Sequence, residues 1–298
     1  MATTTSVMNT ARPSFAQQSY VREAMRRLLR KPTAIVGLTL LAIMIAAAIL
    51  APMIAPYEPD EQGAGDPFAP PSRANLLGTD QFGRDVLTRV LYGGRISLQV
   101  GLIAVAIGGS LGLVLGCAAG YLSGWTDEAV MRFIDIMLAF PGILLAIAVV
   151  IMLGPSLQNL MIAVGIGAVP TFARIVRASV LDIKERDYVA AAHALGTADL
   201  VIIARHILPN IMAPFIVLAT LDVATAILSG TALSYLGMGA KPPTAEWGLM
   251  LSEGRTSIRT AWWVGTFPGL AITITVIGIN LLGDALRDAL DPRLRGTR

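Results

Sequence analysis

Long apolar runs separated by shorter polar segments dominate the pattern of this chain. A bilayer core about 30 Å thick requires about 20 mainly apolar residues per helix. The pattern therefore predicts an all-α integral membrane protein, a polytopic bundle of about six transmembrane helices. The expected spans cover residues 33–54, 96–121, 133–153, 157–176, 211–236 and 264–282.

The first apolar run follows a basic segment and is longer than the apolar region of a signal peptide, which has about 7–15 residues. We interpret it as a retained span. The chain then divides into a cytoplasmic tail over 1–32 and a transmembrane domain over 33–298. Three later spans contain proline, at Pro141, Pro170 and Pro214, which membrane helices tolerate when neighbours satisfy the freed carbonyls.

Lysine and arginine set the expected orientation through the positive-inside rule. With the N-terminus in the cytoplasm, most of the 23 Lys and Arg residues lie in cytoplasmic segments. We therefore expect both termini in the cytoplasm. An outer loop over 55–95 and a cytoplasmic loop over 182–209 follow from this arrangement.

Composition excludes several classes of function. The charge of +3 comes with no basic stripe interleaved with aromatics, so no nucleic-acid partner is expected. None of the lysines, Lys31, Lys184 and Lys241, stands between Gly and Ser or Thr, so the chain carries no phosphate-binding P-loop. It also has no His-Glu-x-x-His motif and a single cysteine, which argues against a transition-metal site.

Glycine recurs every four residues in the second run, at Gly108, Gly112, Gly116 and Gly120. Four small residues on one helix face let another helix approach closely. We interpret this glycine stripe as a packing surface. The alternative is a direct role in lining a pore.

The segment from Gly108 to Gly112 also fits the nucleophile pattern G-x-S-x-G, with Ser110 at its centre. That pattern carries its meaning at a strand-to-helix turn, whereas Ser110 lies in a predicted membrane helix. An intramembrane serine protease would need a histidine at membrane depth as the base. His193 and His206 are expected outside the membrane, which disfavours this alternative.

Asp222 falls inside the fifth run, between Leu221 and Val223. A carboxylate at membrane depth is costly and usually faces a bundle interior or a water-filled cavity. Two interpretations stay open: a structural contact with a neighbouring helix, or a place on the translocation path.

The cytoplasmic loop over 182–209 is too long for a simple connection. Its alanine-rich part, residues 186–195, predicts a helix. Gly196 is placed to end that helix in a left-handed conformation. Thr197 is expected to cap a second helix that has Asp199 in its first turn and ends at Pro209. From composition alone, this is an amphipathic hairpin on the membrane surface.

The spacing in this loop resembles the EAA loop of ABC-importer permeases, in which Glu-Ala-Ala is followed after three residues by Gly, and after nine more by Ile-x-Leu-Pro. Ala190 stands in place of the glutamate and His206 in place of the isoleucine, so the particular contact of that glutamate is not retained. The matching positions are Ala191, Ala192, Gly196, Leu208 and Pro209.

The resemblance extends over nearly the whole chain after residue 20. It is to the dipeptide/oligopeptide/nickel permease family, and within it to the "C" permease of the pair. The segments that carry it are 77–86, 92–98, 233–243 with Trp247 and Gly248, and 280–294.

This resemblance implies the fold of an ABC type I importer permease in a bacterial inner membrane. It implies a permease subunit for di- or oligopeptides, with no catalytic residues, that forms half of the translocation path. Expected partners are a second homologous permease, one or two ATPase subunits that hold ATP and Mg²⁺, an extracytoplasmic binding protein and membrane lipid. An ATP-independent channel or secondary transporter is the alternative, and nickel chelates or glutathione are alternative substrates.

The resemblance also assigns roles to two sets of residues. The loop that couples to the ATPase would use Arg186, Asp187, Tyr188, Ala190, Ala191, Ala192, Leu195, Gly196, Leu208 and Pro209. The outer loop would either hold its own fold or contact the binding protein and gate the path through Gly78, Thr79, Asp80, Gly83, Arg84 and Asp85.

Overall fold

The computed structural model describes residues 26, 28–29 and 31–290. In this part of the chain all the regular secondary structure is helical, which confirms the expected all-α bundle. The expected tail over 1–32 lies almost entirely outside the described residues. The helices are α2 (Pro32–Ile54), α3 (Val86–Leu122), α4 (Gly124–Leu138), α5 (Gly142–Leu153), α6 (Leu157–Lys184), α7 (Asp187–Ala194), α8 (Asp199–Ile202), the π-helical turn η1 (Ile203–Ile207), α9 (Leu208–Tyr235), α10 (Trp247–Gly254) and α11 (Trp263–Leu290).

Five segments of the described chain are long and apolar enough to cross a membrane, and a bent helix pair brings the number up to six. Helices α2, α3, α6, α9 and α11 coincide with five of the expected spans. The expected span over 133–153 is not one continuous helix, because α4 and α5 meet there at 92°. The bend falls at Pro141, whose backbone is extended (ψ 133°). Proline also disfavours helical geometry at the residue before it.

The outer loop is shorter than expected, because α3 begins at Val86 and residues 86–95 are helical. The Asp85 carboxylate caps this helix by accepting a hydrogen bond of 2.8 Å from the Thr88 N–H. An acidic N-cap satisfies a backbone donor that the first turn leaves free. The expectation of a loop over 55–95 therefore holds only as far as Asp85.

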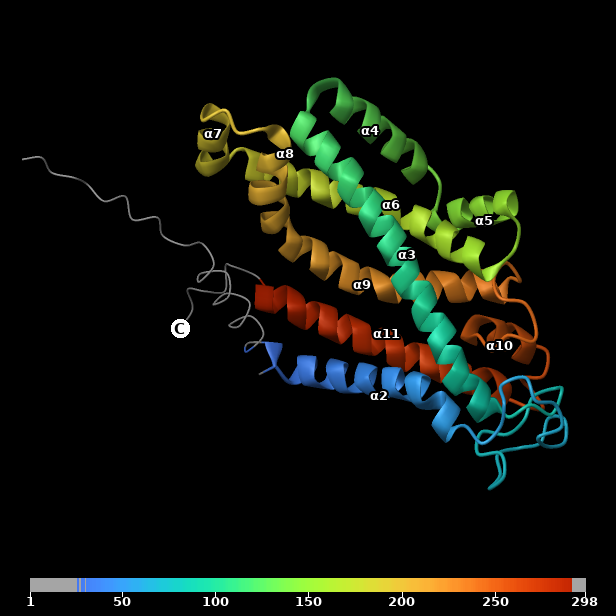
Figure 1. Cartoon of the computed structure of the whole chain (residues 1–298). Helices are drawn as coiled ribbons and strands as arrows, with labels where there is room; N and C mark the ends of the chain where they lie inside the picture. Colours follow the sequence, from blue (N-terminus) through green and yellow to red (C-terminus); the bar gives the residue numbers. More distant parts are fainter. Residues whose placement is uncertain (1–25, 27, 30, 291–298) are drawn as a thin grey trace, which may run out of the picture.

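Helices α2 and α11 lie side by side, with α9 next to them and α3 crossing all three (Figure 1). Gly37 of α2 meets the backbone of α11 at Gly278. At the end of this pair, Lys31 Nζ lies 2.7 Å from Asp288 Oδ2. The start of the first described span and the end of the last one are thus at the same side of the bundle.

Helices α3 and α6 form the most extensive helix contact in the described chain. The glycine stripe lies on this contact: a Cβ on Gly108 would meet Gly165 O at 2.6 Å, and one on Gly116 would meet Ala173 O at 2.6 Å. The interpretation of the stripe as a packing surface is confirmed, since the two backbones approach too closely for side chains between them.

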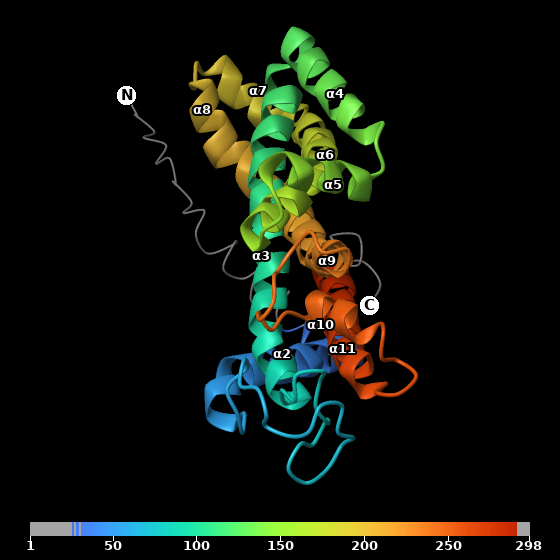
Figure 2. The same ribbon diagram turned by 90° about the vertical axis from the view of Figure 1, so that its right-hand side faces the viewer.

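The Ser110 hydroxyl donates to the Ile107 carbonyl of its own helix at 3.1 Å. His193 lies in α7 and His206 in η1, at the end of the molecule where α7 and α8 project (Figure 2). Neither is hydrogen-bonded to the serine, so the geometry of an activated nucleophile is not present among the described residues.

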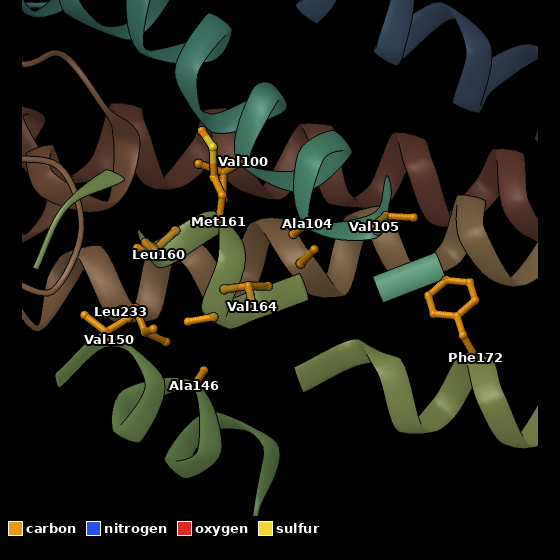
Figure 3. Packing of buried hydrophobic residues seen from close by; sticks show 12 residues of the cluster. Val100, Ala104, Val105, Ala146, Val150, Leu160, Met161, Val164, Phe172 and Leu233 are labelled. Carbon is orange, nitrogen blue, oxygen red and sulfur yellow. The ribbon is translucent and has the colours of Figure 1, made fainter. Parts of the chain in front are cut away.

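A core cluster joins four helices at the centre of the bundle (Figure 3). Val100 and Ala104 from α3 pack with Leu160 and Val164 from α6. Helices α5 and α9 add further side chains to the cluster. This cluster packs α5 against α6 and α9, and some of its residues also line an intramembrane cavity.

Candidate coupling hairpin, outer-loop network and intramembrane cavity

Residues 185–207 form a helical hairpin that projects from one end of the bundle (Figures 1 and 2). Helix α7 spans Asp187–Ala194, close to the expected 186–195. Gly196 follows it with φ +75°, which confirms the expected left-handed helix end. The Gly196 N–H donates to His193 O and the Thr197 N–H to Ala192 O, so the turn closes on the carbonyls of α7.

Two details of the second half of the hairpin differ from expectation. Thr197 does not cap α8: the N-cap is Ala198, with no side-chain hydrogen bond. Pro209 does not end the second helix either, because α8, η1 and α9 follow one another without a break and Pro209 lies in the first turn of α9. Proline is compatible with a first turn because its missing N–H would be unpaired there.

The hairpin divides into a buried face and an exposed face. Val189 and Ala192 pack inward with Ile202 and Ile207 against the ends of α3 and α6. Leu195 and Leu200, on either side of the turn, are 85% and 80% exposed. The other exposed residues of the predicted coupling set are Arg186, Asp187, Tyr188, Ala190, Ala191, Gly196 and Pro209. Leu208 is half-buried.

Polar contacts fix the hairpin to the end of α3. The Tyr121 hydroxyl donates to Asp199 Oδ1 at 2.6 Å. Lys184, at the end of α6, donates from Nζ to the Tyr121 carbonyl at 2.6 Å and to Ser123 Oγ at 3.0 Å. These contacts were not predicted. They link the hairpin directly to α3 and α6.

At the opposite end, residues 55–85 form the outer loop (Figure 1). Gly78 and Gly83 adopt φ +76° and φ +70°, as expected of tight turns. The Thr79 hydroxyl donates to the Asp66 carbonyl and accepts from the Ala69 N–H.

Asp80 and Arg84 form the centre of a buried ion-pair network. Each is 2% exposed. Arg84 Nε lies 2.5 Å from Asp80 Oδ2, and Arg84 Nη2 lies 3.1 Å from Glu253 Oε2 of α10. Arg89 of α3 also reaches Glu253, at 3.4 Å. The network ties the outer loop to α3 and α10, and its charged groups face the protein interior.

Sequence reasoning missed Arg89, Glu253 and Glu246 as members of the outer polar structure. Glu246 caps α10 by accepting 2.8 Å hydrogen bonds from the Gly248 and Leu249 N–H groups. Burial raises the pKa of Glu246 above its ordinary value, and these hydrogen bonds oppose the rise. Glutamate is not among the residues preferred at an N-cap, so no local pattern indicated this cap.

Asp222 lies near the middle of α9 and lines a cavity of about 170 Å³. The wall comes from α5, α6 and α9. Its polar side chains are Asp222, Thr171, Thr225 and Ser229, and its apolar ones include Ala146 and Val164. The predicted candidate thus lies at a cavity rather than in a sealed helix contact.

Two known protein families match this chain. The profile of the binding-protein-dependent transport system inner membrane component family matches residues 112–296. The N-terminal TM domain of oligopeptide transport permease C matches residues 19–71. Together the two matches cover both the first span and the part of the chain that carries the hairpin and the cavity.

Curated relatives match over nearly the whole chain. The dipeptide transport system permease protein DppC of Alkalihalophilus pseudofirmus is 48% identical, over 92% of this chain and 90% of the relative. The di/tripeptide transport system permease protein DppC of Pseudomonas aeruginosa is 44% identical, over 95% of each. The glutathione transport system permease protein GsiD of Escherichia coli is 45% identical, over 92% and 91%.

Among solved structures, an inward-facing form of the MetNI methionine ABC transporter is similar. The TM-score is 0.56 at 19% identity, over 68% of this chain and 96% of that one. This supports the fold of an ABC importer permease. The relatives are transport subunits, and ATP hydrolysis in such importers belongs to partner subunits. The chain is a multi-pass permease subunit of an ABC importer and belongs to the family of binding-protein-dependent transport system inner membrane components.

Proposed function

We propose that this permease imports short peptides across a bacterial inner membrane, as one half of a pair with a second, homologous permease. The substrate class is supported by the relatives at 44–48% identity, whose names give dipeptides, tripeptides and glutathione. All three are small peptides with a free ammonium group and at least one carboxylate. The chain binds no cofactor in this proposal, and ATP and Mg²⁺ belong to the partner ATPases.

The exposed hairpin carries the second part of the proposal, that it docks on the ATPase subunits. Leu195 and Leu200 project from a turn that is fixed to α3 and α6. Exposed leucines beside small alanines favour a protein partner, because burial of an apolar side chain contributes about 1.5–3 kcal/mol. Ala190 offers no carboxylate, so the docking would rest on shape and apolar contact.

The orientation of the chain in the membrane can be inferred from the hairpin end of the molecule. The start of α2 and the end of α11 lie at the hairpin end, opposite the outer loop (Figure 1). Lys184, Arg186 and Arg205 belong to this end as well. The positive-inside rule then assigns this end, with both termini, to the cytoplasm. The outer loop and α10 would face the extracytoplasmic binding protein.

The first experiment is isolation of the tagged full chain from its host in mild detergent, with identification of the co-purifying proteins by mass spectrometry. One or two P-loop ATPases and a related permease are expected. Reconstitution of that complex with its binding protein should give peptide uptake that depends on ATP. Uptake without ATP or an ATPase partner would favour a channel or secondary transporter instead.

A pair of variants tests the docking surface. Leu195→Ser combined with Leu200→Ser should lower the amount of co-purifying ATPase severalfold. Met152→Ser is the matched control, because Met152 is also 85% exposed but lies at the end of α5, outside the hairpin. Equal recovery of ATPase with both variants would contradict the docking role of the hairpin.

A further inference from the structure

Asp222 has no partner within the described part of the chain: none of these residues forms a hydrogen bond or an ion pair with its carboxylate. Charged groups at membrane depth are rare and almost always face a bundle interior or a water-filled cavity, where they are paired or mark a substrate pathway. Among the described residues, no neighbouring helix supplies the contact that the structural interpretation of Asp222 requires.

Polar side chains gather around Asp222 on one face of α9. Thr225 and Ser229 follow at three and seven residues, which places them on the same helix face. Thr171 faces them from α6. Three hydroxyl groups and one carboxylate thus line a cavity of about 170 Å³, which is large enough for several waters at about 30 Å³ each.

This face is not suited to contact with lipid. Thr171 and Thr225 are exposed, and Asp222 is half-buried. A carboxylate exposed to hydrocarbon would cost several kcal/mol. The stable alternative is a surface covered by a second permease and reached by water, which is the position of the path between two subunits.

We propose that this cavity is a recognition point for the side-chain ammonium groups of peptides on the translocation path, with Asp222 as the charged contact. The inference rests on the proposed peptide import and adds a specificity-determining residue to it. A primary ammonium has three donors and no acceptor, which matches one carboxylate surrounded by hydroxyl oxygens. In the described residues no group of three or more His, Cys, Asp or Glu side chains converges on a metal position, so the site suits an ammonium better than a bound metal ion.

The expected consequence is a preference for cationic over anionic peptides that belongs to the permease rather than to the binding protein. The experiment uses the full importer in proteoliposomes. ATP-dependent uptake of a lysine-containing and a glutamate-containing peptide is compared, each presented on saturating, fully loaded binding protein. Because the binding protein is the same throughout, a change in the uptake ratio between permease variants reports on the permease.

Asp222→Asn removes the charge with little change in shape, and Asp222→Ser is a second, smaller replacement. Either should lower the lysine-to-glutamate uptake ratio about tenfold, since a hydrogen bond to a charged group contributes at least the 1.4 kcal/mol that corresponds to one decade. Asp222→Glu should retain the preference. Thr220→Val is the matched control, because Thr220 lies on α9 and its hydroxyl bonds to the Ile216 carbonyl of its own helix.

An unchanged ratio in both charge-removing variants would overturn the inference. Loss of complex assembly in both would also overturn it, because Asp222 would then be a packing residue. If the wild-type complex gave no ATP-dependent uptake of either peptide, the proposed function would fail first, and the inference with it. These outcomes are distinct, because assembly, wild-type uptake and the ratio are measured separately.

Discussion

Gly116→Ala is the most direct test of how α3 and α6 are held together. A Cβ on Gly116 would lie 2.6 Å from Ala173 O and 2.7 Å from Val176 Cβ. An ordinary contact begins near 3.4 Å, so the helices must separate by about 0.8 Å at this point. The nearest atom belongs to the backbone of α6, and no side-chain rotation can relieve the clash.

This geometry sets the loss in the free energy of unfolding that we expect for Gly116→Ala. Overpacking of a close contact typically destabilises a protein by about 1–3 kcal/mol, and alanine recovers up to about 1 kcal/mol through its higher helix propensity. Gly269→Ala is the matched control. The nearest atom to a Cβ on Gly269 is the flexible Leu251 Cδ2, at 3.7 Å. This variant should keep the gain in propensity without the clash.

The assay is thermal unfolding of the purified protein in detergent, followed by loss of the monodisperse peak in size-exclusion chromatography. With about 2 kcal/mol between the two variants, the midpoint for Gly116→Ala should lie roughly 4–8 °C below that for Gly269→Ala. Equal midpoints would show that α3 and α6 can separate without cost, and the packing role of the glycine stripe would be refuted.

Three further variants test the ends of the molecule. Gly196→Val forces a β-branched residue into φ +75°, which costs about 1–3 kcal/mol locally. ATP-dependent uptake by this variant should fall at normal expression, whereas Gly196→Asn should retain uptake. Unchanged uptake by the valine variant would contradict the docking role of the hairpin. Arg84→Met removes the closer of the two arginines that Asp80 and Glu253 share and should destabilise the protein by about 3–5 kcal/mol in thermal unfolding. An unshifted midpoint would count against the ion-pair network. Tyr121→Phe removes the hydrogen bond to Asp199. The complex should still assemble, but the number of peptides imported per ATP hydrolysed should fall. If that number is unchanged, this hydrogen bond does not transmit motion.

The sequence predicted the spans well because each depends on a local property. Twenty apolar residues can be recognised without knowledge of what surrounds them. The two errors arise where local polarity and local geometry diverge. Residues 86–95 are helical but mixed in polarity, so the apolar-run criterion placed them in the loop. Residues 133–153 are apolar throughout but contain the bend at Pro141, and hydropathy carries no information about direction.

The candidate sites were predicted unevenly for a similar reason. The left-handed turn at Gly196 could be predicted from a single glycine after an alanine-rich helix, and Gly196 does adopt φ +75° in the structure. Glu253, the second partner of Arg84, is 169 positions away in the sequence, and Asp199, the partner of Tyr121, is 78 positions away. No local pattern could indicate these two partners. Asp222 was identifiable as an anomaly in an apolar run. That it lines a cavity depends on how α5 and α6 pack against α9, which only the fold determines.

The distribution of contacts suggests how the two ends of the bundle communicate. Helix α3 has 37 residues and is therefore about 55 Å long. It begins at the buried ion-pair network and ends at Tyr121 beside the hairpin. Because the glycine stripe joins α3 to α6 by backbone contact, these helices should move as a pair when the hairpin is displaced. The other close pair, α2 and α11, is held together at Gly37 and Gly278. Helix α9 contacts both pairs and carries Asp222, so a relative rotation of the two pairs would change the cavity at Asp222 while each pair stays intact.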